Sequence, residues 1–328
     1  MELSATDEGR HLPGTDQFWG ESWYHDFAAA DGSYGGYLRL GLYPNQKVAW
    51  SWIYLVRAGR PLVVVRDHAV PCPEFASASD DSQVLVKSLA DSAHAGSSTW
   101  EPVQPLQSYR IWASGNGVEL ANPADAFLSV NDEPETGPPV AVELDLTWTG
   151  VTPPYAYTVT TRFEQSAWVD GTIRIGDDSF TVHCPGQRDH SWGTRDWWLF
   201  GWVWCSGRLD DGTWWHSARS IVPKLDIFQA GYIVTPDMTL TPVSEVGIEY
   251  ALDADQLPRH GTLTVGDLVL DWEAQLPAPV LLVSPEGKQS RFPRALCRFT
   301  TADGRAGAGW IEFNFPDGVA RSGQLEGN

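Results

Sequence analysis

Alternation of bulky apolar residues at every second position most limits how this sequence can fold. Between residues 47 and 57, five large side chains fall on one face of a predicted β-strand: Val48, Trp50, Trp52, Tyr54 and Val56. The same period of two recurs in residues 140–148, 172–175 and 310–315. Because 31 glycines and 23 prolines are spread through the chain, long helices have little room. The sequence therefore predicts an all-β protein with few short helices.

Turn signals separate these alternating runs. Asp-Gly dipeptides at 170–171, 211–212 and 303–304 are typical of two-residue hairpin turns, in which both central residues adopt positive φ. The best helical candidate is 82–93, although its apolar spacing is ambiguous. Many short antiparallel strands must close into barrels or stack as sandwiches to hide their edges. Since neither half has the immunoglobulin Cys–Trp–Cys spacing, the sequence favours barrels.

The length of the chain, 328 residues, favours two domains over one. A polar, Pro-rich stretch at 150–155 interrupts the alternation ahead of a predicted strand at 158–163. We therefore place the domain junction near residue 165. We expect an N-terminal barrel over 1–165 and a C-terminal barrel over 166–328.

Charge and cysteine usage narrow the class of partner. The chain has 42 acidic and 22 basic residues and a net charge of −20, so its surface repels nucleic-acid phosphates and anionic lipid heads. No apolar run reaches the roughly 18 to 20 residues of a membrane helix, and the start MELSATDEGRH does not resemble a secretory signal. The four cysteines form no CxxC pair. We therefore expect reduced thiols in a cytoplasmic protein.

Residues 186–198 concentrate charged groups and indoles. Their sequence, GQRDHSWGTRDWW, contains two arginines, two aspartates, one histidine and three tryptophans. If the segment is a strand, Arg188, His190 and Trp192 share one face and Asp189 lies on the other. Charged groups beside indoles are costly to bury unless they are paired, so we expect a local network between these arginines and aspartates.

Two structural interpretations of this segment remain open beside a catalytic one. Its charges could form a salt-bridge lattice that closes a barrel end, with Trp192 as a plug, and its tryptophans could simply belong to a core. Ser191 beside His190 does not indicate a nucleophile and its base, which must be close in space. His183, His190 and His216 fit no short ligand spacing, so we expect no metal.

The string GQRDHSWGTRDW at 186–197 resembles the signature of the carotenoid 1,2-hydratase (hydroxyneurosporene synthase)/AttH-like superfamily, which also includes fungal Diels–Alderase-type cyclases. Other stretches resemble landmarks of the same group: 21–24, 36–41, 163–165 and 309–312. The resemblance spans roughly residues 15 to 315. It implies two lipocalin-like β-barrels of the calycin group in tandem, in agreement with the all-β prediction.

The resemblance also implies a chemistry. Carotenoid hydratases add water to an isolated trisubstituted alkene without a cofactor, which requires an acid able to protonate carbon and a surface that stabilises a tertiary cation. A carboxylic acid kept neutral by burial can supply the proton. Desolvated indole faces stabilise a cation by about 1 to 2 kcal/mol each, and a histidine can orient or deprotonate water. In the hydratase pattern, His190 and Trp192 are the matching functional positions.

We derive two sets of candidate residues. The catalytic candidates belong to the signature: His190, Trp192, Asp189, Asp196 and Arg188. If arginines pair with both aspartates, they lower the pKa of those carboxyls. The acid would then be another group: Glu164, Asp226 or a protonated His190. The hairpin at 211–212 folds His216 back toward the signature, and the substrate-binding candidates are Arg195, Trp197, Trp198, Trp202, Trp204, His216 and Tyr232.

These observations leave three functions. The first is a cofactor-independent enzyme, a hydro-lyase or a cyclase, acting on a hydrophobic terpenoid, polyene or polyketide-like molecule. The second is a pericyclase that folds a polyene and polarises a carbonyl. The third is a lipocalin-like protein that binds a hydrophobic ligand without chemistry. A binder has no need of clustered Arg, Asp and His, so the signature favours catalysis, with a hydrophobic small molecule as the partner and no cofactor.

Overall fold

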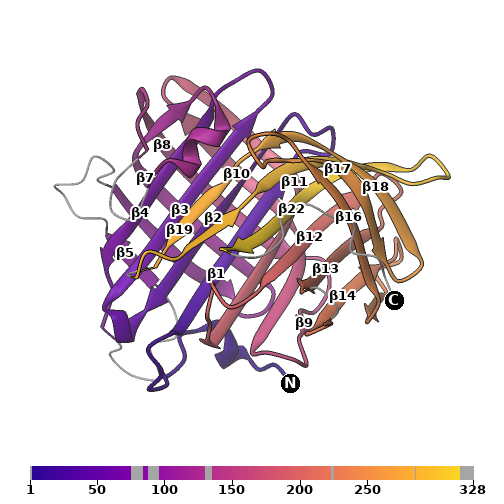
Figure 1. The fold of residues 1–328 in the computed structure, drawn as a ribbon, viewed down its shortest axis with the longest axis horizontal. Coiled ribbons are helices and arrows are strands. Elements are labelled where there is room, and N and C mark those ends of the chain that lie inside the picture. Colours follow the sequence, from indigo (N-terminus) through magenta and orange to yellow (C-terminus); the bar gives the residue numbers. More distant parts are fainter. Residues whose placement is uncertain are drawn as a thin grey trace.

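The computed structural model describes residues 2–74, 84–87, 96–129, 135–222, 225–284 and 286–317. Two large antiparallel sheets curl into barrel-like shapes that lie side by side (Figure 1). The helices of the described residues are three short 3₁₀ segments: η1 (Ala5–Glu8), η2 (Pro44–Gln46) and η3 (Pro123–Phe127). The all-β prediction is confirmed. Within the same residues, no helix has the length and apolar character needed to cross a bilayer.

The first sheet closes on itself. Its strands are β1 (Trp19–Ala28), β2 (Tyr34–Tyr43), β3 (Val48–Arg57), β4 (Leu62–Pro71), β5 (Val84–Lys87), β6 (Gly96–Gln104), β7 (Ser108–Leu120), β8 (Pro139–Gly150), β9 (Tyr155–Ala156), β10 (Arg162–Ile175) and β11 (Asp178–Thr194). They run in the order β4-β3-β2-β1-β11-β10-β8-β7-β6-β5, and β4 also pairs with β7, which completes the first barrel.

The second sheet curls without closing among the described residues. Its strands are β12 (Gly201–Leu209), β13 (Trp214–Ile221), β14 (Gln229–Val234), β15 (Leu240–Val243), β16 (Val246–Leu252), β17 (Pro258–Val265), β18 (Leu268–Pro277), β21 (Arg294–Thr300) and β22 (Ala306–Pro316). They run β15-β14-β13-β12-β22-β21-β18-β17-β16. The ribbon of β19 (Val280–Val283) and β20 (Gln289–Phe292) reaches across β2 and β3 of the first sheet (Figure 1).

The chain changes sheet between Thr194 and Gly201. This change comes later than the junction expected near residue 165, which lies inside β10. The signature therefore belongs to the first sheet, whereas the sequence analysis placed it in the C-terminal barrel. The physical reason is that β10 and β11 form a long hairpin with continuous pairing, and β11 also pairs with β1 to close the first barrel.

Three apolar clusters explain the many tryptophans. One fills the first barrel with residues such as Trp23 and Trp148, and another fills the second with residues such as Trp215 and Trp272. The third lies between the barrels and includes Trp52. Strands at this contact are buried on both faces, which is why β3 carries aromatic groups on the face that leaves the barrel.

Two of the three hairpin positions are confirmed, since the dipeptides at 211–212 and 303–304 lie in turns between strands. The expected turn type is wrong, because only the glycine of each dipeptide has positive φ, 95° for Gly212 and 92° for Gly304. The prediction at 170–171 is wrong because these residues lie within β10. Gly171 is required there for another reason: a Cβ atom would lie 1.9 Å from the backbone oxygen of Asp145 in the neighbouring strand. Of the helix expected over 82–93, only 84–87 is described, and it forms β5.

Candidate active site between the barrels

A cavity of about 410 Å³ lies between the two barrels. Outward-facing residues of β1, β2, β3, β11 and β12 form much of its wall, and the segment that joins the two sheets closes one side. Its apolar lining is mostly aromatic: Tyr24, Trp52, Tyr157, Trp197, Phe200, Trp202, Trp204, Phe228 and Phe292. A volume of this size with a few polar groups on an apolar wall is typical of small-molecule sites.

The alternation of β11 divides the signature between two environments. Asp189 and Ser191 line the cavity. Arg188 and His190 point the other way and are buried among the residues inside the first barrel. Trp192 follows them and stacks on His11 with ring centroids 3.8 Å apart. The predicted division of faces is thus confirmed.

The expected local network between signature arginines and aspartates is wrong. Arg188 pairs with Glu8, at 2.6 Å between Nη1 and Oε1, and not with Asp189. Arg195 forms no salt bridge within 4 Å among the described residues. Neighbours along a strand point to opposite faces, so adjacent Arg and Asp side chains cannot meet. The partners come from distant parts of the chain.

Asp189 shares one guanidinium group with a second carboxyl. Glu164 lies directly opposite Asp189 in the pairing of β10 with β11, so both side chains project to the same face. Arg162 Nη2 lies 2.7 Å from Asp189 Oδ2 and 2.5 Å from Glu164 Oε1. Glu164 also accepts hydrogen bonds from Trp204 Nε1 at 2.9 Å and Gln187 Nε2 at 2.8 Å. One cation thus serves two buried carboxylates.

Burial, and not a lack of nearby cations, favours a retained proton. It raises the pKa of Asp189 to about 7, helped by the charge of Glu164, while Arg162, Arg195 and Arg39 oppose this effect without cancelling it. Burial likewise raises the pKa of Glu164 above its ordinary value, against the effect of Arg162. Two buried carboxyls that face each other can therefore hold a proton near neutral pH, as an acid that donates to a bound molecule must do.

Tyr157 brings a hydroxyl group to the same wall. Its oxygen lies 2.6 Å from Nε2 of His216, and His216 Nδ1 donates to the carbonyl oxygen of Cys205 at 3.0 Å. Since Nδ1 carries the proton, Nε2 accepts from the Tyr157 hydroxyl. Burial lowers the pKa of His216 well below its ordinary value, helped by the charge of Arg162, so the ring is neutral.

Three other arginines line the wall: Arg39, Arg195 and Arg294. Arg39 lies between the rings of Trp52 and Trp197, at 4.8 and 5.2 Å from their centroids, and donates to the hydroxyl oxygen of Tyr43. Among the described residues, its Nη1 and the Nε of Arg195 are buried without a hydrogen-bond partner. Burial next to Arg162 lowers the pKa of Arg195 to about 10. Guanidinium groups in a cavity wall are suited to bind an acceptor group on a ligand.

The family model for a domain of unknown function, DUF7064, matches residues 4–317. The chain belongs to the DUF7064 family. No functionally curated protein matches the sequence of this DUF7064 chain.

Solved structures share the DUF7064 fold at low sequence identity. An AttH-like protein from Nitrosomonas europaea is 15% identical, with a TM-score of 0.62 and 94% of each chain covered. CghA is 11% identical, with a TM-score of 0.53, and 97% of this chain and 95% of that protein are covered. Kievitone hydratase from Nectria haematococca is 10% identical, with a TM-score of 0.52 and coverages of 95% and 93%. The AttH-like resemblance seen in the sequence is confirmed for the fold.

The DUF7064 structure separates the predicted site residues into two groups. Those that line the cavity are Asp189, Arg195, Asp196, Trp197, Trp202 and Trp204. Those that do not line it are Arg188, His190, Trp192, Trp198, His216 and Tyr232. His216 accepts a hydrogen bond from Tyr157, which lines the cavity. The Tyr232 hydroxyl donates to Gln187 Oε1 at 3.0 Å, behind the lining residues. Asp226, an alternative acid, is exposed.

Several residues of the wall were not expected from the sequence, and Arg162, Tyr157 and Arg39 are those that contact the polar groups described above. Arg162 and Tyr157 lie in a segment without a recognisable motif, and Arg39 lies within 36–41, where no site residue was expected. The spacing of Arg162 and Glu164, two residues apart at the end of the strand predicted at 158–163, was the available signal that these two charged side chains share a face. His183 and His216 lie apart from His190: His183 is exposed against Asp170, and His216 is buried between the barrels.

Proposed function

We propose that this DUF7064 protein is a cofactor-independent enzyme that adds water to, or removes water from, an apolar small molecule in the cavity between its barrels. The observation that carries the proposal is Asp189, a carboxyl with a raised pKa on the wall of an aromatic cavity. The name of kievitone hydratase, which shares the fold, supports hydration as a chemistry suited to this architecture.

The proposed addition begins with proton transfer to carbon. Neutral Asp189 gives its proton to one alkene carbon, and the positive charge develops on the other. A water molecule then attacks that carbon and returns one proton to the Asp189 carboxylate, so the acid is regenerated. The reverse sequence removes water. Arg162 and Glu164 position the Asp189 carboxyl throughout.

The aromatic wall has a role in this step. Trp52, Trp202 and Trp204 line the same cavity as Asp189. A developing carbocation is attracted to an indole face by about 2 kcal/mol when water is excluded. The same side chains bind the apolar body of the substrate before any charge develops.

The arginines of the wall refine the substrate class. Arg39 and Arg195 line the cavity, and a pure hydrocarbon would offer their guanidinium groups no acceptor. We therefore propose a substrate with an apolar body and an acceptor group, such as the carbonyl or phenolate of a prenylated polyketide or aromatic compound.

The same two arginines favour cyclisation as a second candidate function. Hydrogen bonds from Arg39 and Arg195 to a carbonyl oxygen would polarise a conjugated alkene, and the cavity walls would hold the reacting ends together. A cyclisation of this kind needs no proton from Asp189. A cyclase of this kind depends on its arginines and tolerates loss of the carboxyl.

One experiment separates these functions. The purified protein is incubated with prenylated phenols, polyenes and polyketide-like carbonyl compounds in H₂¹⁸O, and products are detected by mass spectrometry. Hydration adds one labelled water to the product, whereas cyclisation leaves the mass unchanged. Recovery of bound but unaltered compounds across the whole panel would overturn both catalytic proposals and support ligand storage.

A further inference from the structure

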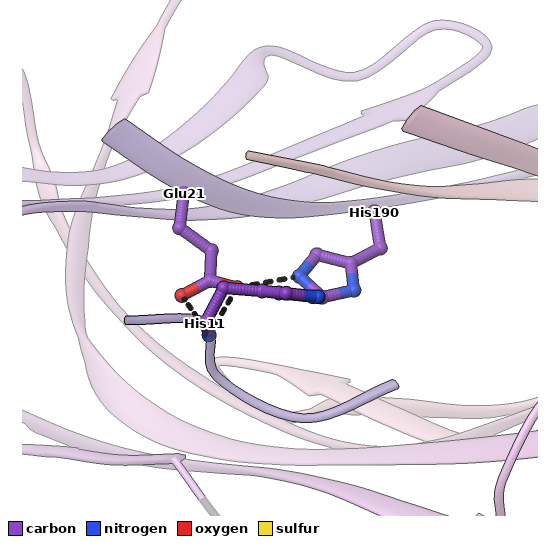
Figure 2. A group of neighbouring side chains, drawn as sticks. All are labelled: His11, Glu21 and His190. Atoms are coloured by element: carbon purple, nitrogen blue, oxygen red, sulfur yellow. Dashed lines mark hydrogen bonds and ion pairs between the residues drawn. The ribbon is translucent and has the colours of Figure 1, made fainter. Parts of the chain in front are cut away.

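A second polar cluster lies inside the first barrel, across β11 from the cavity. Glu21 in β1 pairs with Trp192 in β11, and Trp23 pairs with His190. Glu21 and His190 are therefore diagonal neighbours on the inner face of the barrel. His11 reaches the same point from the N-terminal segment, and Figure 2 shows the three side chains converging.

The donor atoms of these side chains are close enough to share one ion. Glu21 Oε1 lies 2.8 Å from His11 Nδ1 and 3.0 Å from His190 Nε2. One ligand atom from each of the three residues lies within 4.8 Å of the others. Ligands of a tetrahedral zinc ion lie about 3.3 Å apart, given bonds of about 2.0 Å. The two carboxylate–imidazole spacings are within about half an ångström of that value, and the two imidazole nitrogens, which lie within 4.8 Å of each other, would move together around the ion.

The far side of each imidazole also faces oxygen. His190 Nδ1 lies 2.8 Å from the backbone oxygen of Asp7, and His11 Nε2 lies 3.4 Å from Asp7 Oδ1. A neutral imidazole has one N–H, so one ring nitrogen of each histidine would direct its lone pair at an acceptor. A cation between the rings and Glu21 removes this conflict, and the outer N–H groups then donate to Asp7. Metal-binding histidines have this outer contact almost always.

We propose that His11, Glu21 and His190 bind one divalent transition-metal ion of the zinc class. Two imidazole nitrogens and one carboxylate are a ligand set that zinc and similar ions prefer. Trp23 and Trp192 stack on the two rings and hold them in place. Glu21 and His190 are buried, whereas 20% of the His11 side chain is exposed, which leaves access for an ion and for water as a fourth ligand.

The bound ion would fasten the N-terminal segment to the first barrel. That segment also inserts Glu8, which pairs with Arg188 inside the barrel. His25, in the same barrel, differs from His11 and His190. Its ring is packed against Trp100, Tyr109 and Trp148, and among the described residues neither ring nitrogen has a hydrogen-bond partner.

The test uses the untagged full-length chain after chelator treatment and dialysis. We expect titration with ZnCl₂ to give one tightly bound zinc per chain by elemental mass spectrometry, and CoCl₂ to give visible absorption bands of a low-symmetry site. His11→Ala should weaken zinc binding at least about tenfold and remove the cobalt bands. The matched control is His183→Ala, an exposed histidine outside the cluster, which should bind zinc like the wild type.

Absence of stoichiometric zinc and of cobalt bands in the folded wild-type protein would overturn the proposal. Zinc binding that is unchanged in His11→Ala would also overturn it. The wild-type measurements need no variant to fold. Because Asp189 lies on the other face of β11, either failure leaves the proposed reaction in the cavity untouched.

Discussion

The two faces of β11 carry similar side chains in different surroundings. On the inner face, Arg188 meets Glu8 in a buried pair with matched charge. On the cavity face, Asp189 competes with Glu164 for the single guanidinium of Arg162. A matched ion pair stabilises the fold, whereas a carboxyl whose pKa is raised by burial keeps a proton that can act on a ligand. Adjacent residues of one motif, such as Arg188 and Asp189, can therefore have different roles.

The largest expected effect is on the cavity face. Asp189→Asn keeps the shape of the side chain but removes the acid, so we expect kcat for hydration to fall by about 10² to 10⁴-fold. Asp145→Asn is the control, because Asp145 is an exposed carboxylate paired with Arg110 on the outside of the barrel. Turnover is measured as ¹⁸O incorporation with the best compound of the panel. Full activity in Asp189→Asn would move the acid to another group or favour the cyclase.

The second prediction concerns the buried ion pair on the inner face of β11 and is tested by the free energy of unfolding. Arg188→Met leaves Glu8 buried without its cation, so we expect the free energy of unfolding to fall by about 3 to 5 kcal/mol. The exposed Arg110→Met should cost at most about 1 kcal/mol. Urea denaturation of both variants measures the difference. Equal losses would show that the buried pair contributes no more than a surface one.

A smaller effect is expected behind the cavity wall. Tyr157→Phe removes the hydroxyl that donates to His216 Nε2 and leaves a buried acceptor unsatisfied. We expect a loss of about 1 to 3 kcal/mol in the free energy of unfolding. Tyr155→Phe, half-buried beside Tyr157, should stay within about 0.5 kcal/mol of the wild type. An unchanged free energy of unfolding in Tyr157→Phe would indicate that the hydrogen bond to His216 is weak.

The last and smallest expected effect is on the slope of stability against pH. Because the pKa of Asp189 is raised to about 7 in the folded protein, the folded state binds this proton more tightly than the unfolded chain does. Its contribution to stability is complete below the ordinary pKa of 3.8 and is lost as pH rises through about 7. Asp189→Asn should therefore lose stability less steeply than the wild type over this range, by at most about 1.4 kcal/mol per pH unit. A steeper loss would contradict the raised pKa.

Much of the fold and part of the site follow from the sequence. The period of two predicted the strands at 47–57 and 140–148 and the division of Arg188 and Asp189 between faces, because strand geometry alone decides these. The barrel pairing that brings β11 against β1 is not local, so neither the late change of sheet nor the first-barrel location of the signature could be derived.

The partners of the signature were hidden for the same reason. Glu8 reaches Arg188 from 180 positions away, and Arg162 reaches Asp189 from 27. The alternation predicts which residues share a face of the strand. It does not predict whether that face points into the first barrel or outward to the second barrel. His190 was therefore expected beside the substrate, whereas its side chain points into the interior of the first barrel. Its contact with His11 depends on the path of an irregular segment without a periodic pattern.

The cavity is built from the outsides of two barrels, and this has a consequence for evolution. Each barrel keeps its own interior packing, so replacing a residue such as Trp202 or Phe228 reshapes the chamber without disturbing either core. New specificities are therefore accessible by few mutations on a robust scaffold. A molecule held there touches both halves at once, so occupancy would couple their unfolding into one transition.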